Sequence, residues 1–285
     1  MQECELQNLA DEATLNGWQN ALYDFSKKRV LNHQSIPEDA RISDWSFLLP
    51  LPAQGTRDAL VLGCGWGAIP IHLSQFCGQV CVVETSPAKI QFLEARKAQQ
   101  RITNLKLKQW DFWEDSFSQE SFDLVCLHGL ESPSDKKIHF SEVLKKMAQW
   151  LRKEGVLFLN VPNRWSLLLK ERSSHYPFSS HTLLGYRKML ERSGFEDIHF
   201  YAPLPHYNGI PLFYLPLHDS TAMIYFFKNI FPLFEMVSPE SKKAYALEYR
   251  VAKLGVNLSL ALHLTRFVKY FVSGFSVVAK KRISL

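Results

Sequence analysis

The sequence predicts an α/β protein whose mostly parallel β-sheet is covered by helices on both faces. Short apolar runs, such as Val80–Val83, alternate with amphipathic stretches of helical length between Thr56 and Tyr201. Strands that alternate with helices form parallel sheets, and strands buried on both faces appear as continuous apolar runs. The hydrophobic fraction of 46% in 285 residues is sufficient for one substantial core.

The expected elements follow from these runs in order. Strands are predicted at 59–62, 80–83, 105–107, 122–127, 156–161 and 195–201. Helices are predicted at 69–76, 87–100, 135–152 and 182–193. Pro87 suits the first turn of a helix, and Gly155 and Gly194 are expected to end the last two helices.

The two flanks of this region have different patterns. Residues 1–54 show helical spacing without a strand pattern, whereas an aromatic loop interrupted by prolines begins at Ala202. Apolar helices are expected at 220–237 and 239–270, before a final strand at 271–279. We therefore expect a helical cap at 1–55, a sheet core at 56–202 plus 270–285, and a helical insertion at 203–269.

Charge and cysteine content narrow the class of protein. The net charge is +5, but the basic residues form only short clusters, so we expect no nucleic-acid partner. None of the five cysteines forms a C-x-x-C pair, which indicates reduced thiols and a cytoplasmic location. The first 20 residues do not resemble a secretory signal. No run reaches the roughly 18 apolar residues of a membrane span, so we expect no stable membrane insertion.

A glycine cluster follows the first predicted strand and precedes the first helix of the sheet region, in the segment Leu60-Val61-Leu62-Gly63-Cys64-Gly65-Trp66-Gly67. A sharp turn between strand and helix needs residues that tolerate positive φ, and a backbone that approaches a ligand closely has no room for side chains. Glu84 ends the second strand, where its carboxylate can accept hydrogen bonds from ribose hydroxyls. Asp111 follows the third strand and can accept a hydrogen bond from an adenine amino group, beside the aromatic faces of Trp110 and Phe112.

This set of motifs resembles the class I S-adenosylmethionine (SAM)-dependent methyltransferases. The glycine segment resembles their motif I, Glu84 their ribose-binding acid and Asp111 their adenine-proximal acid. Residues 121–126 and 151–157 resemble their fourth-strand and fifth-strand signatures. The resemblance implies a Rossmann-like, seven-stranded sheet with an antiparallel last strand, SAM as cofactor and S-adenosylhomocysteine as product. The cofactor-binding residues it implies are Gly63, Cys64, Gly65, Gly67, Glu84, Thr85, Trp110, Asp111, Phe112 and His128.

One position departs from the family pattern. An acid usually stands two residues before the first glycine, where this chain has Val61. Because of this departure, a second interpretation stays open: a catalytically inactive protein that keeps the methyltransferase fold. A nicotinamide-dependent dehydrogenase is disfavoured, because a single residue, Trp66, separates the second and third glycines and leaves little room for a pyrophosphate.

Acceptor-site candidates follow from the rule that ligands bind beyond the carboxyl ends of the strands. His128 directly follows the fourth strand and is the candidate general base, because the ordinary pKa of histidine lies near neutrality. A role as a pocket-lining residue or a helix cap stays open for it. The candidate substrate-binding residues are Glu131, Asn163, Arg164, His175, Tyr176, His206 and Tyr207. No spacing of Cys and His indicates a metal.

These features predict O-methylation of a small-molecule, lipid-linked or saccharide acceptor. The insertion starts at the carboxyl end of the sixth strand, so we expect it to roof the acceptor site, although its aromatic residues could equally form insertion core or a homodimer face. A SAM-binding partner subunit without activity is the main alternative. A peripheral enzyme whose helix at 220–237 contacts lipid is another.

Overall fold

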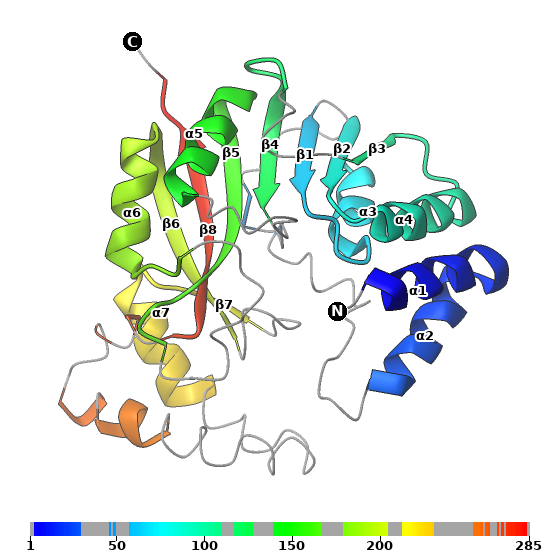
Figure 1. Cartoon of the computed structure of the whole chain (residues 1–285). Coiled ribbons are helices and arrows are strands. Elements are labelled where there is room, and N and C mark those ends of the chain that lie inside the picture. The colour runs from blue at the N-terminus through cyan, green and yellow to red at the C-terminus, as the bar shows by residue number, and fades with distance from the viewer. Residues whose placement is uncertain are drawn as a thin grey trace.

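The centre of the molecule is an eight-stranded sheet with the order β3-β2-β1-β4-β5-β8-β6-β7, seen in the computed structural model in Figure 1. The structure describes residues 3–29, 46, 48–49, 57–109, 117–127, 139–166, 179–204, 213–230, 253–258, 260–262, 267, 269–270 and 272–283. The strands are β1 (Asp58–Leu62), β2 (Gln79–Glu84), β3 (Leu105–Gln109), β4 (Phe122–Leu127), β5 (Leu151–Pro162), β6 (Phe195–Leu204), β7 (Phe213–Pro216) and β8 (Gly274–Lys281).

The first five strands are parallel, and β8 lies antiparallel between β5 and β6. The predicted mostly parallel sheet with an antiparallel last strand is therefore confirmed, with one strand more than the seven expected. Because β6 is also antiparallel to β8, it runs in the same direction as β5. Its carboxyl end consequently lies at the same edge of the sheet as the ends of β1, β4 and β5.

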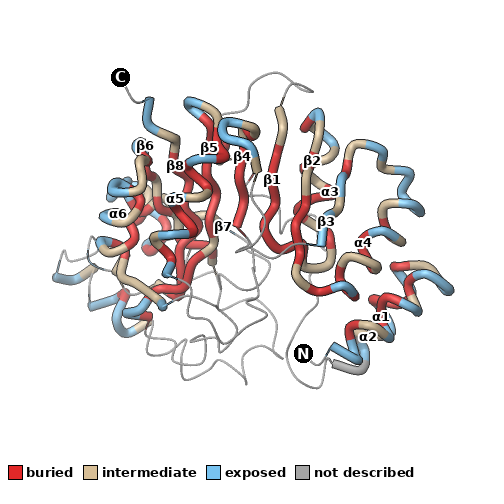
Figure 2. The backbone as a smooth tube through the Cα atoms, turned by 45° about the horizontal axis from the view of Figure 1, so that its top comes forward, coloured by how far each residue is buried: buried red, intermediate tan, exposed pale blue. Residues whose placement is uncertain are grey.

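Helices cover both faces, as predicted. On one face α5 and α6 pack against β4, β5, β6 and β8, and on the other α3 packs against β1, β2 and β4. Figure 2 shows the resulting pattern, with buried strands at the centre and exposure on the outer helices. The labelled helices are α1 (Glu3–Asn16), α2 (Trp18–Arg29), α3 (Ala68–Ser74), α4 (Pro87–Gln99), α5 (Phe140–Trp150), α6 (Leu183–Arg192), α7 (Ser220–Tyr225) and the π-helix η4 (Phe226–Ile230).

The junction between α5 and β5 differs from the prediction. The helix ends at Trp150, and β5 begins at Leu151 instead of 156. Gly155 lies inside this strand, where a Cβ atom would come within 2.8 Å of the Arg152 carbonyl oxygen. The register of β5 against β4 shifts here, since Leu151 pairs with Phe122 and Val156 with Leu124, and Arg152 forms ion pairs with Asp58 and Asp123. Glycine therefore permits a close turn inside the strand and does not end the helix.

The insertion contains a strand that the sequence pattern missed. Four residues, Phe213–Pro216, form the edge strand β7, which pairs with an extension of β6 to Leu204. We expected a loop there because prolines surround the segment, but proline is tolerated in edge strands. Within the expected helix at 220–237, the described part is the short α7 followed by the π-helical turn η4.

The N-terminal residues form a helical hairpin, α1 and α2, that packs against α4. Gly17 joins the two helices with a φ of +88°, a conformation that favours glycine. Leu9, Ala13 and Leu22 are fully buried against Phe92 of α4. In Figure 1 the hairpin lies next to α4, at the side of the sheet where β1 and β2 end. Among the described helices, none has the length and apolar character that crossing a bilayer requires.

Candidate functional site

The glycine segment forms a tight bend between β1 and α3. Gly63, Gly65 and Gly67 have φ angles of +81°, +50° and +91°. A Cβ on Gly67 would lie 2.5 Å from the Leu93 Cδ1 atom, whereas a Cβ on Gly65 would meet no atom within 4 Å. Gly67 is therefore favoured by its positive φ and by its close packing against α4. Gly65 borders open space at the carboxyl end of β1, as close approach of a ligand would need.

Glu84 ends β2 beside this bend, and its side chain is 1% exposed. Its Oε2 atom accepts a hydrogen bond from the Cys64 backbone N–H at 3.0 Å. Its Oε1 atom accepts hydrogen bonds from the Thr85 and Ser86 backbone N–H groups at 2.8 and 3.2 Å. One carboxylate thus joins the glycine bend to the loop after β2. These backbone donors stabilise the buried negative charge and hold it at the edge of the sheet.

The Cys64 thiol also contacts Glu84. Its Sγ atom lies 3.4 Å from the Glu84 Oε2 atom and is in position to donate a hydrogen bond. Burial, together with the charge of Glu84, raises the pKa of this thiol well above its usual value. Cys64 therefore stays protonated near neutral pH and acts as a donor to Glu84, without the thiolate character of a nucleophile.

Trp66 packs under the bend, against the N-terminal hairpin and α4. Its ring makes edge-to-face contacts with Phe25 of α2 and Phe92 of α4, at centroid distances of 5.9 and 5.4 Å. Its carbonyl oxygen accepts a hydrogen bond from the Arg96 guanidinium, which lies 3.9 Å above the Trp18 ring. The N-terminal hairpin therefore supports the glycine bend directly.

Val61 occupies the position where the family pattern has an acid. Its side chain is fully buried in the cluster that includes Ile69 of α3 and Val82 of β2. A charge in this apolar site would be costly, since the cluster supplies no ionic partner. The valine therefore serves the core below the bend, and the backbone donors around Glu84 organise the loop.

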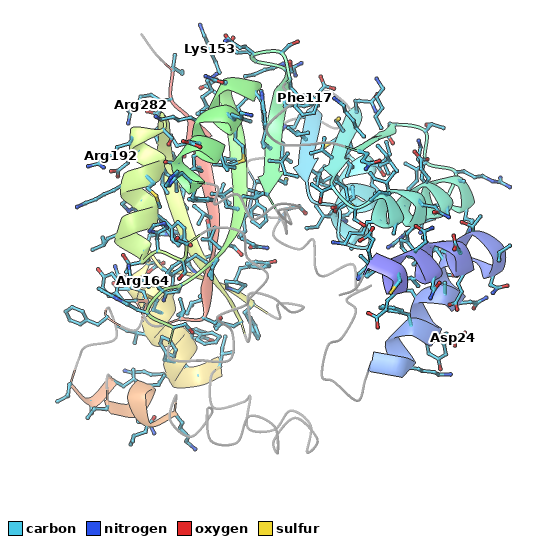
Figure 3. The ribbon with its side chains drawn as sticks, in the orientation of Figure 1. Asp24, Phe117, Lys153, Arg164, Arg192 and Arg282 are labelled. Carbon is cyan, nitrogen blue, oxygen red and sulfur yellow. The ribbon has the colours of Figure 1, made fainter. Side chains whose placement is uncertain are left out.

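Two candidate substrate residues, Asn163 and Arg164, follow β5 in the described part of the chain. The Asn163 side chain is buried, whereas the Arg164 side chain is exposed. The buried Asn163 amide donates to the Tyr270 and Val272 carbonyl oxygens, both at 2.8 Å, and accepts from the Trp165 N–H. Asn163 thus ties the end of β5 to the segment that leads into β8. The Arg164 side chain is exposed and lies at the left in Figure 3, below Arg192 and away from Lys153 and Arg282. Burial, followed by the charge of Arg164, lowers the pKa of the neighbouring His181.

Nine of the candidate residues lie outside the described part of the chain. Among the cofactor candidates these are Trp110, Asp111, Phe112 and His128, and among the substrate candidates Glu131, His175, Tyr176, His206 and Tyr207. The structure brings together Gly63, Cys64, Gly65, Gly67, Glu84 and Thr85 at one edge of the sheet. In the described ranges, no three His, Cys, Asp or Glu side chains gather as a metal site would require.

Three residues near the bend had no part in the sequence argument. Ser86 caps α4 and donates a hydrogen bond from Oγ to the Glu3 carboxylate at 2.8 Å. The Ser-Pro pair before a helix is a recognisable N-cap signal, which could have identified Ser86. Arg96 and Trp18 gave no such signal, because their contact joins residues that are far apart in the sequence.

Part of the chain is similar to a known protein family. Residues 59–155 match a family model described as a methyltransferase domain. That range spans the glycine bend, Glu84, β2 to β4, β1 from Ala59 and the start of β5 up to Gly155. No curated protein matches the chain.

Solved structures share the fold at low sequence identity. Phosphoethanolamine N-methyltransferase 2 from Haemonchus contortus, in complex with phosphomonomethylethanolamine and S-adenosylhomocysteine, has 14% identity and a TM-score of 0.57. The match covers 98% of this chain and 60% of that protein, so the chain spans less than two thirds of its length. The same nematode protein in complex with SAM gives a TM-score of 0.55 at 14% identity, over 97% of this chain and 60% of that one. The [4+2]-cyclase SpnF gives 0.51 at 13% identity, over 88% of this chain and 86% of SpnF.

Proposed function

We propose that the chain, whose residues 59–155 match a methyltransferase domain, transfers a methyl group from SAM to an oxygen atom of a small-molecule, lipid-linked or saccharide acceptor. The observation that supports the proposal best is the buried Glu84 carboxylate beside the glycine bend. A carboxylate at this position can accept hydrogen bonds from ribose hydroxyls. The open space at Gly65 fits close approach of a cofactor to the backbone.

The chain's own residues would bind and orient the two reactants. SAM, when bound, supplies a methyl group activated by a sulfonium. Gly63, Gly65 and Gly67 would allow the backbone to approach it, and Cys64 and Thr85 would hold the Glu84 side chain in place. We propose that Trp110 and Phe112 stack on the adenine and that Asp111 accepts from its amino group.

Proton removal from the acceptor is assigned to His128, which follows β4 in the sequence. Transfer to a hydroxyl requires loss of its proton, and a neutral imidazole accepts one near pH 7. Substrate contacts are proposed for Glu131, Asn163, Arg164, His175, Tyr176, His206 and Tyr207. An apolar groove of about 430 Å³ between β7 and α7, lined by Phe213, Tyr214, Tyr225 and Phe226 among others, would accommodate an apolar part of the acceptor.

Calorimetric titration with SAM and S-adenosylhomocysteine, followed by turnover with radiolabelled SAM on a panel of hydroxyl acceptors, tests the proposal. We expect micromolar cofactor binding that Glu84→Ala abolishes and that His128→Asn weakens only in part, because His128 is one of several candidate cofactor contacts. Turnover should be lost in both variants. The matched control is Glu94→Ala, because Glu94 is a half-exposed acid on α4 away from the bend. Failure of the folded wild-type chain to bind either nucleoside contradicts the proposal.

A second candidate is a SAM-binding partner subunit that carries out no methyl transfer. The buried Val61 at the usual position of an acid favours it. SpnF, a protein named for a cyclase activity, shares the fold at a TM-score of 0.51. Tight cofactor binding without turnover on any acceptor of the panel would support this candidate over the enzyme.

We also propose a cellular location and an oligomeric state for the protein. All five cysteines are free thiols, which fits the reducing conditions of the cytoplasm. A homodimer through the C-terminal helical region stays a prediction, and sedimentation velocity on the purified chain measures it. A 66 kDa species, twice the 32.9 kDa mass of the chain, is expected for the dimer.

A further inference from the structure

Arg96 is a buried arginine of α4 that contacts the glycine bend. It is 6% exposed. Its Nη1 atom donates a hydrogen bond to the Trp66 carbonyl oxygen at 2.7 Å, and its guanidinium lies 3.9 Å from the centre of the Trp18 ring. Burying a charge is costly unless its partners offset that cost. An aliphatic side chain would fill this space without that cost, so the charge at position 96 needs an explanation beyond packing.

Side chains hold the glycine bend on both sides of Gly65. On one side, the Cys64 N–H donates to the Glu84 carboxylate at 3.0 Å. On the other side, the Trp66 carbonyl oxygen accepts from Arg96. Gly65 itself has a φ of +50° and open space where a Cβ would be. Glycine has more backbone freedom to lose than any other residue, so a glycine-rich bend depends on such neighbouring contacts to hold one conformation.

Arginine is suited to this position because its guanidinium is planar. A planar cation can lie over an aromatic ring and still donate hydrogen bonds from its N–H groups. Arg96 does both, with the Trp18 ring as one partner and the Trp66 carbonyl oxygen as the other. The compact ammonium of a lysine matches such a pair of partners less well. One residue of α4 therefore joins the first residue of α2 to the glycine bend.

Trp18 is held in place for this contact by the packing of the hairpin on α4. Its N–H donates to the Gln99 side chain at 3.0 Å, and the Gln99 amide donates to the Ala13 carbonyl oxygen at 3.0 Å. Gln99 lies three residues after Arg96, on the same face of α4. Trp18 is also buried in the cluster that contains Phe92. The contact with Arg96 thus depends on the position of the hairpin next to α4 (Figure 1).

Arg187 of α6 makes the same two kinds of contact elsewhere in the molecule. Its guanidinium lies 5.2 Å from the centre of the Phe200 ring, and its Nη2 atom donates to the Ile198 carbonyl oxygen at 3.3 Å. Both partners belong to β6, which three strands separate from β1 in the sheet. An arginine that only attaches a helix to its neighbours should behave like Arg187, which makes this residue the matched control.

We propose that Arg96 is a positioning residue for the cofactor. By holding the Trp66 carbonyl oxygen, it keeps the backbone at Gly65 in the conformation that binds SAM, and through Trp18 it makes that conformation depend on the docked hairpin. The inference rests on the proposed SAM site. Because coupling between two sites is reciprocal, bound SAM should in turn stabilise the hairpin on α4.

Arg96→Met tests the proposal, because methionine keeps a long apolar side chain and removes the hydrogen bond to Trp66. The full chain is titrated with SAM and S-adenosylhomocysteine by calorimetry, and its unfolding midpoint in urea is measured in parallel. We expect at least about tenfold weaker binding of both nucleosides. The midpoint should fall no more than in Arg187→Met, which should bind SAM like wild type. Arg96→Lys, which keeps a charged donor, should recover part of the affinity.

Hydrogen exchange followed by mass spectrometry gives a readout that packing alone would not change. Without cofactor, the amides of residues 63–67 should exchange at least about fivefold faster in Arg96→Met than in wild type, while those of α6 stay unchanged. Added SAM should slow exchange in residues 3–29 of the wild type, but not in Arg96→Met or Trp18→Leu. Trp18→Phe, which keeps an aromatic ring, should respond like wild type.

Several results would overturn the inference. They are wild-type SAM affinity in Arg96→Met, unchanged exchange at residues 63–67, and a loss of affinity that Arg187→Met shares. A Trp18→Leu variant in which SAM still slows exchange of the hairpin would contradict the coupling through Trp18. If the wild-type chain binds neither nucleoside, the proposed function is wrong, and the exchange rates measured without cofactor then decide alone whether Arg96 orders the bend.

Discussion

The region of the glycine bend and the insertion differ in what surrounds their side chains. Around the bend a buried polar group is hydrogen-bonded, whereas in the insertion large apolar groups are exposed. Around the glycine bend, the buried Glu84 carboxylate is held by backbone N–H groups, and the bend itself is supported through Trp66. In the insertion, by contrast, Leu254, Leu258 and Tyr225 remain more than half exposed. The comparison indicates that the region of the glycine bend is organised by contacts within the chain, whereas the described part of the insertion leaves several large apolar side chains exposed. Five variants examine that difference.

The largest effect is expected from Glu84→Ala. Loss of the carboxylate leaves the Cys64, Thr85 and Ser86 N–H groups without their acceptor in a buried site. We expect a cost of about 3 kcal/mol in the free energy of unfolding and at least about 100-fold weaker SAM binding. Urea denaturation and calorimetry measure the two quantities. A variant as stable as wild type that still binds SAM normally would show that the bend does not rely on Glu84.

A glycine pair provides the second test. Gly67→Ala combines a φ of +91° with a Cβ 2.5 Å from Leu93, whereas Gly194→Ala has a φ of +89° and open space. Gly194→Ala should cost about 1 kcal/mol from backbone strain, and Gly67→Ala about 2–3 kcal/mol, because overpacking adds to the strain. Only Gly67→Ala should weaken SAM binding. Equal costs for the two variants, measured by thermal unfolding, would remove the packing argument for Gly67.

Asn163→Ala tests the hydrogen bonds that join the end of β5 to the segment between the insertion and β8. The variant leaves the Tyr270 and Val272 carbonyl oxygens without their donor, for a cost of about 1–2 kcal/mol. Because Asn163 holds the segment that leads from the insertion into β8 and its hydrogen bonds do not involve the glycine bend, acceptor turnover should fall while SAM affinity changes less than about twofold. Calorimetry and turnover measured on the same sample separate the two effects, and equal losses in both would show that the halves are coupled.

The smallest effect concerns acid stability near the end of β5. Burial and the charge of Arg164 lower the pKa of His181 from its ordinary value of 6.5. The unfolded chain therefore takes up the His181 proton before the folded chain does, so stability falls as the pH drops below about 6.5. His181→Gln should flatten the decrease in melting temperature between pH 7 and pH 5. A decrease as steep as that of wild type would assign the acid sensitivity to other groups.

The sequence predicted those elements that depend on residues close together in the chain. Buried apolar runs identified the parallel strands, Thr182 and Gly194 bounded α6, and the glycine segment identified the bend. The sequence did not reveal β7 or the long start of β5, because both depend on pairing with distant segments: β7 with the end of β6, and Leu151 with Phe122.

At the site, residue type and position after a strand identified Glu84, but only the fold shows what surrounds it. Cys64 donates to Glu84 through two atoms, and Arg96 joins Trp66 to Trp18. Such contacts join positions separated by tens of residues, and no spacing rule in one sequence encodes them. The described acceptor-side residues likewise show that Asn163 has a structural role that its position after β5 did not suggest.

The position of β8 has a consequence for how the molecule acquires its structure. This strand fills the space between β5 and β6, although the chain reaches it only after the whole insertion. On a ribosome, the β5 edge must wait unpaired until residues 274–281 emerge, and pairing over such sequence distances is slow. Protection of the Phe158 and Val277 amides from hydrogen exchange should consequently appear late during refolding, after the β1–β2–β4 part of the sheet is formed.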